Sequence, residues 1–106
     1  VLVILFPGWN ELSEEDQLLL KKILGSVRLD LAAVQIITCQ EFSLRDLKAY
    51  APQKIIAFGS IFKGFTAQYQ LISHEGISII QADPLRKLDD PKKKSLWMAL
   101  KQMFNI

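Results

Sequence analysis

Short apolar segments alternate along the chain with segments in which apolar residues recur every three or four positions. Three of the short segments, Val1–Phe6, Val34–Thr38 and Lys54–Phe58, have the largely apolar character of strands that are covered on both faces. The segments between them have the spacing of amphipathic helices. This alternation predicts an α/β fold of three layers, α/β/α, in which these strands lie side by side in a mostly parallel central sheet.

Three helices are predicted, each with a start signal. Ser13 is expected to cap the first helix. Ser43 is expected to cap a second helix, Leu44–Tyr50, and Asp90 a third, Pro91–Phe104. The residues that we expect to face the core are Leu19, Leu20, Ile23, Leu24 and Val27 in the first helix and Leu96, Trp97, Leu100, Met103 and Phe104 in the last.

The region between the third strand and the last helix has a weaker pattern. Within Ile61–Tyr69, the apolar residues suggest a short helix that Gly64 interrupts. Gln70–Ser73 and Ile77–Gln81 are predicted strands, and His74-Glu75-Gly76 is the turn between them. We interpret this sole histidine as part of the turn and not as half of a catalytic His–Glu pair.

Composition narrows the class of protein. The 106 residues are predicted to form one domain, since half of them are hydrophobic and only 23% are charged. A net charge of +2 is too small to predict nucleic-acid binding. The single cysteine excludes an intramolecular disulfide and a cysteine-built metal site. No apolar run approaches the roughly 20 residues that span a bilayer. We expect a cytoplasmic protein with no cofactor, no metal and no membrane contact.

Four loops follow predicted strands: Pro7–Asn10, Cys39–Glu41, Gly59-Ser60 and Asp83-Pro84. Because ligand sites of parallel sheets lie at the carboxyl ends of the strands, we expect these loops to meet and to hold any site. Cys39 is expected to be a half-buried small residue, since no base motif accompanies it as a nucleophile. The carboxylate in the last of these loops is expected to accept hydrogen bonds from the turn that follows.

The order of these features resembles the uracil-DNA glycosylase superfamily over nearly the whole chain. The first strand ends in Pro7-Gly8, a leucine-rich helix precedes a strand ending in Thr38, and Pro52-Gln53-Lys54 opens a strand that ends in Gly59. Asp83-Pro84 follows a strand and leads to the lysine-bearing last helix. The resemblance implies the glycosylase-like three-layer fold.

The same resemblance implies that the glycosylase chemistry is absent. Asp83 stands where the superfamily has its catalytic histidine, and Cys39 stands where it has the asparagine that reads the base. An aspartate would repel the negative charge that develops on the departing uracil. The chain is therefore similar to a non-catalytic branch, the psi subunits of bacterial DNA polymerase III, which join the chi subunit to the clamp loader.

Three functions follow as hypotheses. The first is a non-enzymatic protein-interaction module of a DNA replication or repair assembly, which leaves contact with DNA open. The second is a glycosylase-like repair enzyme with a reworked site. The third is a small-molecule-binding α/β domain, although the sequence has no glycine-rich loop to hold a phosphate. Because the chain begins with Val1 and not with Met, the sequence leaves open whether a segment precedes it.

The candidate binding residues lie in the four loops and in the basic stretch before and within the last helix. Trp9 either anchors a partner or folds back over the core. The lysine cluster either contacts a phosphate or an acidic partner or forms a solvated face. The full set is Pro7, Gly8, Trp9, Asn10, Cys39, Gly59, Asp83, Pro84, Lys87, Lys92, Lys93 and Lys94.

Overall fold

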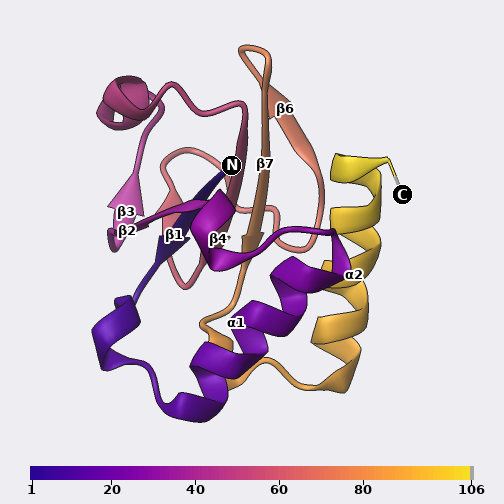
Figure 1. Ribbon diagram of the computed structural model, residues 1–106. Helices are drawn as coiled ribbons and strands as arrows, with labels where there is room; N and C mark the ends of the chain where they lie inside the picture. The colour runs from indigo at the N-terminus through magenta and orange to yellow at the C-terminus, as the bar shows by residue number, and fades with distance from the viewer. Residues whose placement is uncertain (106) are drawn as a thin grey trace.

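The computed structural model describes residues 1–105 and contains a mostly parallel five-stranded sheet with the strand order β2-β1-β4-β7-β6 (Figure 1). The strands are β1 (Leu2–Leu5), β2 (Gln35–Thr38), β4 (Lys54–Phe58), β6 (Ile72–His74) and β7 (Ile77–Ala82). Only β6 runs antiparallel to its neighbour. The predicted side-by-side arrangement of the first three strands is confirmed, with β1 in the middle and parallel to both neighbours.

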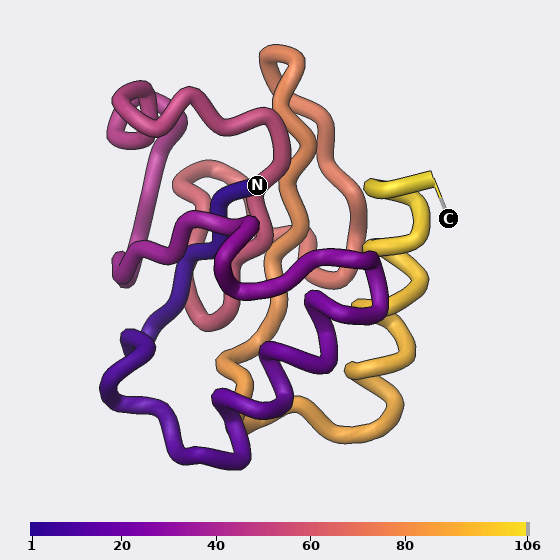
Figure 2. Tube along the Cα trace, viewed as in Figure 1, coloured from indigo at the N-terminus to yellow at the C-terminus, as the bar shows by residue number. Residues whose placement is uncertain are grey.

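Two α-helices, α1 (Glu14–Ser26) and α2 (Asp90–Phe104), cover one face of the sheet, which we call the helical face (Figures 1 and 2). Apolar residues of the strands and of both helices form one buried cluster there, and its main members are Val3, Leu5, Ile56, Phe58, Ile80, Leu20, Leu24, Leu96, Leu100 and Met103. The predicted core stripes of the two helices are therefore confirmed, with one exception. Trp97 is 43% exposed and lies under the Lys101 ammonium, 4.5 Å from the ring centroid.

The helix starts agree with the sequence to within one residue. The Ser13 hydroxyl accepts a hydrogen bond from the Asp16 backbone N–H at 3.2 Å, as expected of an N-cap. For α2 the cap is Asp89 and not Asp90, because the Asp89 carboxylate accepts the backbone N–H of Lys92 at 3.0 Å. The helix consequently begins one residue earlier than predicted. None of the helices within residues 1–105 is long and apolar enough to cross a bilayer.

Shorter elements cover the opposite face of the sheet. They are a 3₁₀ helix (Arg45–Tyr50) and a small parallel sheet of β3 (Glu41–Phe42) and β5 (Ile61–Phe62). The second predicted α-helix is thus a 3₁₀ helix. Its start is held by Ser43, whose backbone N–H donates to the Asp46 carboxylate at 3.1 Å, and it ends at Ala51 in the left-handed conformation. The buried residues of this face are Leu2, Ile4, Phe42, Leu47, Ile55, Ala57, Phe62 and Ile79.

Residues 61–69, which we call the strap, cross this second face without forming the predicted helix. The Gln81 side chain, only 3% exposed, holds the strap through three hydrogen bonds. Its carbonyl oxygen accepts the Phe62 backbone N–H at 3.0 Å, and its amide group donates to the carbonyls of Phe65 and Ala67, both at 3.3 Å. The Phe62 ring stacks on those of Phe42 and Phe65, with centroids 5.1 and 4.4 Å apart. The helix prediction was wrong because these long-range contacts hold the strap in an irregular path, with a turn at Lys63-Gly64 after β5.

Candidate functional site

The four loops that follow the parallel strands lie together at the carboxyl edge of the sheet. The backbone N–H of Cys39 donates to Leu5 O at 3.3 Å, which joins the ends of β2 and β1. Phe6 N–H donates to Phe58 O at 3.0 Å, and Gly59 N–H donates to Ala82 O at 2.9 Å. These three bonds place the starts of all four loops in a row, in the order second, first, third and fourth, as the parallel arrangement predicts.

Two glycines let these loops approach one another closely. Gly59 has a φ of +75°, and a Cβ atom there would lie 2.2 Å from the Phe6 carbonyl oxygen and 2.9 Å from Pro84 Cγ. A Cβ atom on Gly8 would lie 2.6 Å from Thr38 Oγ1. A larger residue at position 59 would therefore push the first and third loops apart, whereas one at position 8 would displace the Thr38 side chain. Among the candidates, Gly8, Gly59 and Pro84 have a packing role in the structure, and Pro7 follows Phe6 through a cis peptide bond.

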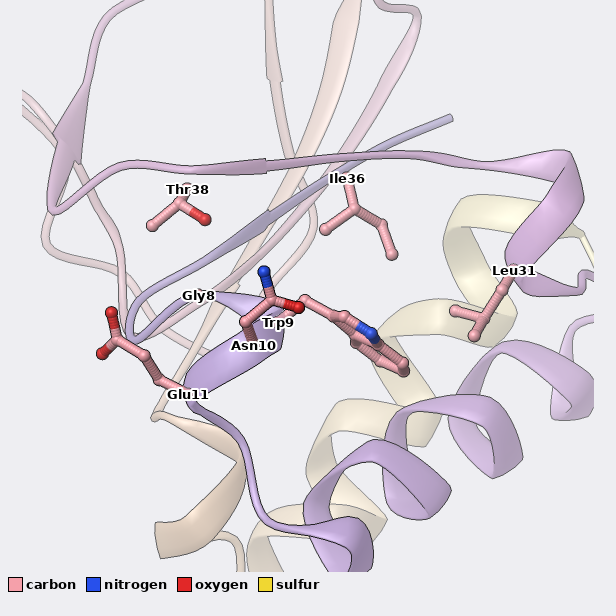
Figure 3. Close-up of a pocket in the computed structure, with 7 residues that line it drawn as sticks. All are labelled: Gly8, Trp9, Asn10, Glu11, Leu31, Ile36 and Thr38. Carbon is pink, nitrogen blue, oxygen red and sulfur yellow. The ribbon is translucent and has the colours of Figure 1, made fainter.

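A groove of about 520 Å³ opens beside the end of β2 (Figure 3). Figure 3 shows the Trp9 ring extending toward Leu31, with Thr38 and Glu11 at the opposite end and Asn10 between them. The lining residues are Gly8, Trp9, Asn10, Glu11, Leu31, Ile36 and Thr38. The groove thus combines an apolar wall with carboxylate, amide and hydroxyl groups.

Trp9 folds back over the core in part, and its role as a partner anchor stays a prediction. Its side chain is half-buried and packs against the helical-face cluster, while the remaining surface lines the groove. The Gln17 side-chain amide donates to the Trp9 carbonyl oxygen at 3.0 Å and fixes the loop to α1. Asn10 beside it is exposed.

Asp83 is engaged by two side chains. The Tyr69 hydroxyl donates to the Asp83 carboxylate at 2.5 Å and accepts the Asp83 backbone N–H at 3.2 Å. Lys92 Nζ lies 3.3 Å from the same carboxylate oxygen. The expected hydrogen bonds from the following turn are therefore replaced by Tyr69 and Lys92. Sequence reasoning missed this tyrosine, because fourteen positions separate it from Asp83 and no motif links the two.

These interactions shift the pKa values of Asp83 and Tyr69. The hydrogen bond from Tyr69, followed by the lysine charge, lowers the pKa of Asp83 below its ordinary value. Burial and the hydrogen bond to Asp83 raise the pKa of Tyr69 to about 12. At neutral pH the cluster thus contains an ionised carboxylate, a neutral phenol and an ammonium group.

The remaining candidates divide between the surface and the core. Lys87, Lys93 and Lys94 are exposed, so of the four candidate lysines only Lys92 has a carboxylate partner within residues 1–105. Cys39 is half-buried against the face opposite the helices, as expected. His74 lies edge-on to Phe65, with centroids 5.2 Å apart. Within residues 1–105 no three His, Cys, Asp or Glu side chains cluster in a way that could hold a metal ion.

Ser60 is a site residue that the sequence reasoning did not single out. Its side chain follows β4 at the carboxyl edge and is 3% exposed. Its hydroxyl is the one buried side-chain polar atom within residues 1–105 that has no hydrogen-bond partner. A serine next to a glycine at a strand end is an ordinary turn signal, so nothing in the sequence distinguishes it.

Comparisons with known proteins found no match to this chain. No protein-family model matches the chain, no curated protein matches it, and no solved structure matches it.

Proposed function

We propose that the chain is a non-enzymatic protein-interaction module of a DNA replication or repair assembly, similar to the psi subunit of bacterial DNA polymerase III. The proposal includes a three-layer fold of the uracil-DNA glycosylase type. The mostly parallel sheet, covered on both faces, is compatible with such a fold. The replication or repair setting rests on the order of sequence features that resembles this superfamily.

The observation that carries the non-enzymatic part of the proposal is the state of Asp83. In the uracil-DNA glycosylases that the chain resembles, this position holds the catalytic histidine, which donates a hydrogen bond to the departing uracil. Here it is a carboxylate that already accepts from Tyr69 and pairs with Lys92, and its lowered pKa keeps it ionised. An ionised carboxylate cannot donate a hydrogen bond to a developing anion. Loss of a single such donor typically slows a reaction by about 10²–10³.

Exposed apolar side chains support the protein-interaction part. Trp97 and Met98 on α2 are 43% and 55% exposed, and Leu18 on α1 is 54% exposed. Aromatic and methionine side chains are enriched in the centres of protein interfaces, where they bury a large area at a low entropy cost. Both helices of the helical face therefore present side chains suited to a partner.

The groove at the carboxyl edge favours a second candidate, a glycosylase-like repair enzyme with a reworked site. Trp9 offers an aromatic ring and Asn10 an amide on the same wall of the groove. Stacking and amide hydrogen bonds are the interactions that hold a flipped base. This enzyme would require a catalytic group other than the one that the resemblance places at Asp83.

Uracil excision separates the two candidates. Purified protein is incubated with single-stranded and double-stranded oligonucleotides that contain deoxyuridine, and free uracil is measured. We expect no release above the protein-free control. Release that disappears in Asn10→Ala or Asp83→Ala would establish the enzyme and overturn the non-enzymatic proposal.

Affinity capture tests the replication or repair setting. The tagged full chain is used to recover partners from an extract of the cells that produce it, and the bound proteins are identified by mass spectrometry. We expect enrichment of DNA replication or repair proteins over a tag-only control. Reproducible enrichment of proteins from another process, or of none, would contradict the assignment.

A further inference from the structure

The two α-helices leave an apolar groove between them on the outer side of the helical face. The groove has a volume of about 210 Å³ and is lined from α1 and α2 together. Its apolar lining is Leu19, Ile23, Leu96, Trp97 and Leu100, and its polar lining is Lys22, Ser26 and Lys93. We call it the interhelical groove. It is separate from the groove at the carboxyl edge, with which it shares no residue.

Trp97 forms an exposed wall of the interhelical groove. It is 43% exposed, although its neighbours Leu96 and Leu100 are buried. Lys93 and Lys101 lie four positions before and after it, so all three share one side of α2. Lys101 already lies over the ring, 4.5 Å from its centroid. This side of α2 thus presents an aromatic ring with a lysine on either side of it.

The charge of the groove is positive. Its two charged lining residues are Lys22 from α1 and Lys93 from α2, and neither makes an ion pair within residues 1–105. Lys93 lies in the first turns of α2, where a positive charge opposes the helix dipole, so helix stability does not account for it. Among residues 1–105, no acidic side chain lines the groove; Glu15 and Asp16 line a neighbouring hollow, which Lys22 and Lys93 also border, and Asp89 and Asp90 precede Lys93 at the start of α2.

We propose that the interhelical groove binds a short acidic, amphipathic peptide segment of a protein partner. One leucine or aromatic side chain of the peptide enters the apolar floor and contacts Trp97. Carboxylates on either side of it pair with Lys22, Lys93 and Lys101. An apolar floor with a cationic rim fits this occupant better than a neutral apolar one, because a neutral segment would leave the lysines desolvated without partners. The inference rests on the proposed function and locates its interaction surface.

The binding test uses a synthetic, fluorescein-labelled peptide of about 15 residues, with leucine at every third or fourth position and glutamate at most others. Anisotropy is measured against the full chain. A peptide with lysine in place of glutamate is the charge control. We expect saturable binding of the glutamate peptide that weakens with added salt, and no binding of the lysine peptide. Equal binding of both peptides, or binding of neither, would overturn the inference.

Matched variants locate the binding site. Trp97→Ala and Lys93→Glu alter the groove, whereas Tyr50→Ala and Lys21→Glu alter exposed residues that do not line it. We expect the first pair to weaken peptide binding on the order of tenfold and the second pair less than about twofold. All four residues are exposed, so thermal melting should show that each variant is folded. Equal losses in both pairs would contradict the assignment to the groove.

Two further outcomes separate the groove from its alternatives and from the proposed function. Self-association of the wild type that Trp97→Ala abolishes would identify a second copy of the chain as the occupant and overturn the peptide proposal. If Lys93→Glu and Trp97→Ala still capture replication or repair proteins as well as the wild type, the groove inference fails and the proposed function stands. If the groove binds the acidic peptide but capture enriches another process, the proposed function fails and the groove stands.

Discussion

On the helical face the sheet is covered by two long amphipathic helices, whereas on the opposite face it is covered by the strap, a two-stranded sheet and a 3₁₀ helix. The helices bring their own local order, because capping and periodic apolar residues specify each of them. The strap has no regular backbone structure beyond the two residues of β5, which pair with β3. Its order comes from Gln81 and from the aromatic stack that includes Phe62. One face is therefore held mainly by apolar packing and the other by packing together with a buried amide.

The two faces should therefore respond differently to the loss of a buried contact. Loss of packing under a helix removes contacts that the whole sheet shares, so it should reduce global stability. Loss of the Gln81 amide should first release the strap, because the strap depends on few contacts and opens independently of the helices. The following predictions test this contrast.

The largest effect is expected from Leu20→Ala on the helical face. Leu20 is fully buried in the cluster beneath α1, and truncation of such a leucine typically costs about 2–5 kcal/mol. Urea unfolding should show the loss as a lower midpoint with an unchanged slope. Leu18→Ala, on the same helix with the side chain 54% exposed, is the matched control and should change stability by less than about 0.5 kcal/mol. Similar losses in both variants would disprove the packing account.

A smaller and more local effect is expected from Gln81→Met. The substitution keeps the length of the side chain but leaves the Phe62 N–H and the carbonyls of Phe65 and Ala67 without their partner. We expect a loss of roughly 2 kcal/mol, since an unpaired buried group typically costs about 1–3 kcal/mol and only the Phe62 N–H bond is fully buried, whereas the two carbonyl bonds are partly exposed to water. Hydrogen exchange should accelerate at the Phe62 amide while the amides of α1 and α2 stay protected.

Ile79→Val is the control for that variant, because Ile79 lies two residues earlier on β7 and is buried on the same face. It should cost about 0.5–1.5 kcal/mol without faster exchange in the strap. If Gln81→Met instead exposed the amides of both helices as much as those of the strap, the two faces would unfold together and the contrast between them would be wrong.

The smallest effect is expected from Tyr69→Phe, which removes the hydroxyl that joins the end of the strap to Asp83. We expect a loss of about 1 kcal/mol at neutral pH, because the bond is partly exposed. The lowered pKa of Asp83 gives stability that is present above the unfolded pKa of about 3.9 and is lost as the pH falls through the lower folded value. The Tyr69 pKa of about 12 gives stability that is lost as the pH rises from about 10 toward 12.

The measurement for this third variant is the free energy of unfolding of wild type and Tyr69→Phe against pH. The difference between them should be greatest between about pH 5 and 9 and should narrow on both sides. Tyr50→Phe, an exposed tyrosine on the 3₁₀ helix, should show no such pattern. A difference that stays constant across the whole pH range would show that Tyr69 acts through packing alone.

Parts of the candidate site could also be predicted from the sequence. Parallel strands bring their carboxyl ends to one edge, so the proximity of the loops around Gly8, Gly59 and Pro84 follows from strand order. The partner of Asp83 could not be predicted, because Tyr69 reaches it only after the strap has crossed the sheet. The sequence also did not predict that Trp97 is exposed. Its position fits the core stripe of α2, and only the placement of α1 beside α2 shows which side of the stripe stays open.

The sequence by itself determined the elements whose signals are local. The strands β1, β2 and β4 and the helices α1 and α2 follow from apolar runs, helical spacing and capping side chains within a few residues of each start. Only the tertiary structure decided the irregular path of the strap, the 3₁₀ form of Arg45–Tyr50 and the hydrogen-bond partners of Gln81 and Asp83. The physical reason is distance along the chain. A cap or a stripe joins residues three or four positions apart. The hydrogen bonds of Gln81 and Asp83 instead join groups fourteen to nineteen positions apart, which become neighbours only when the sheet has formed.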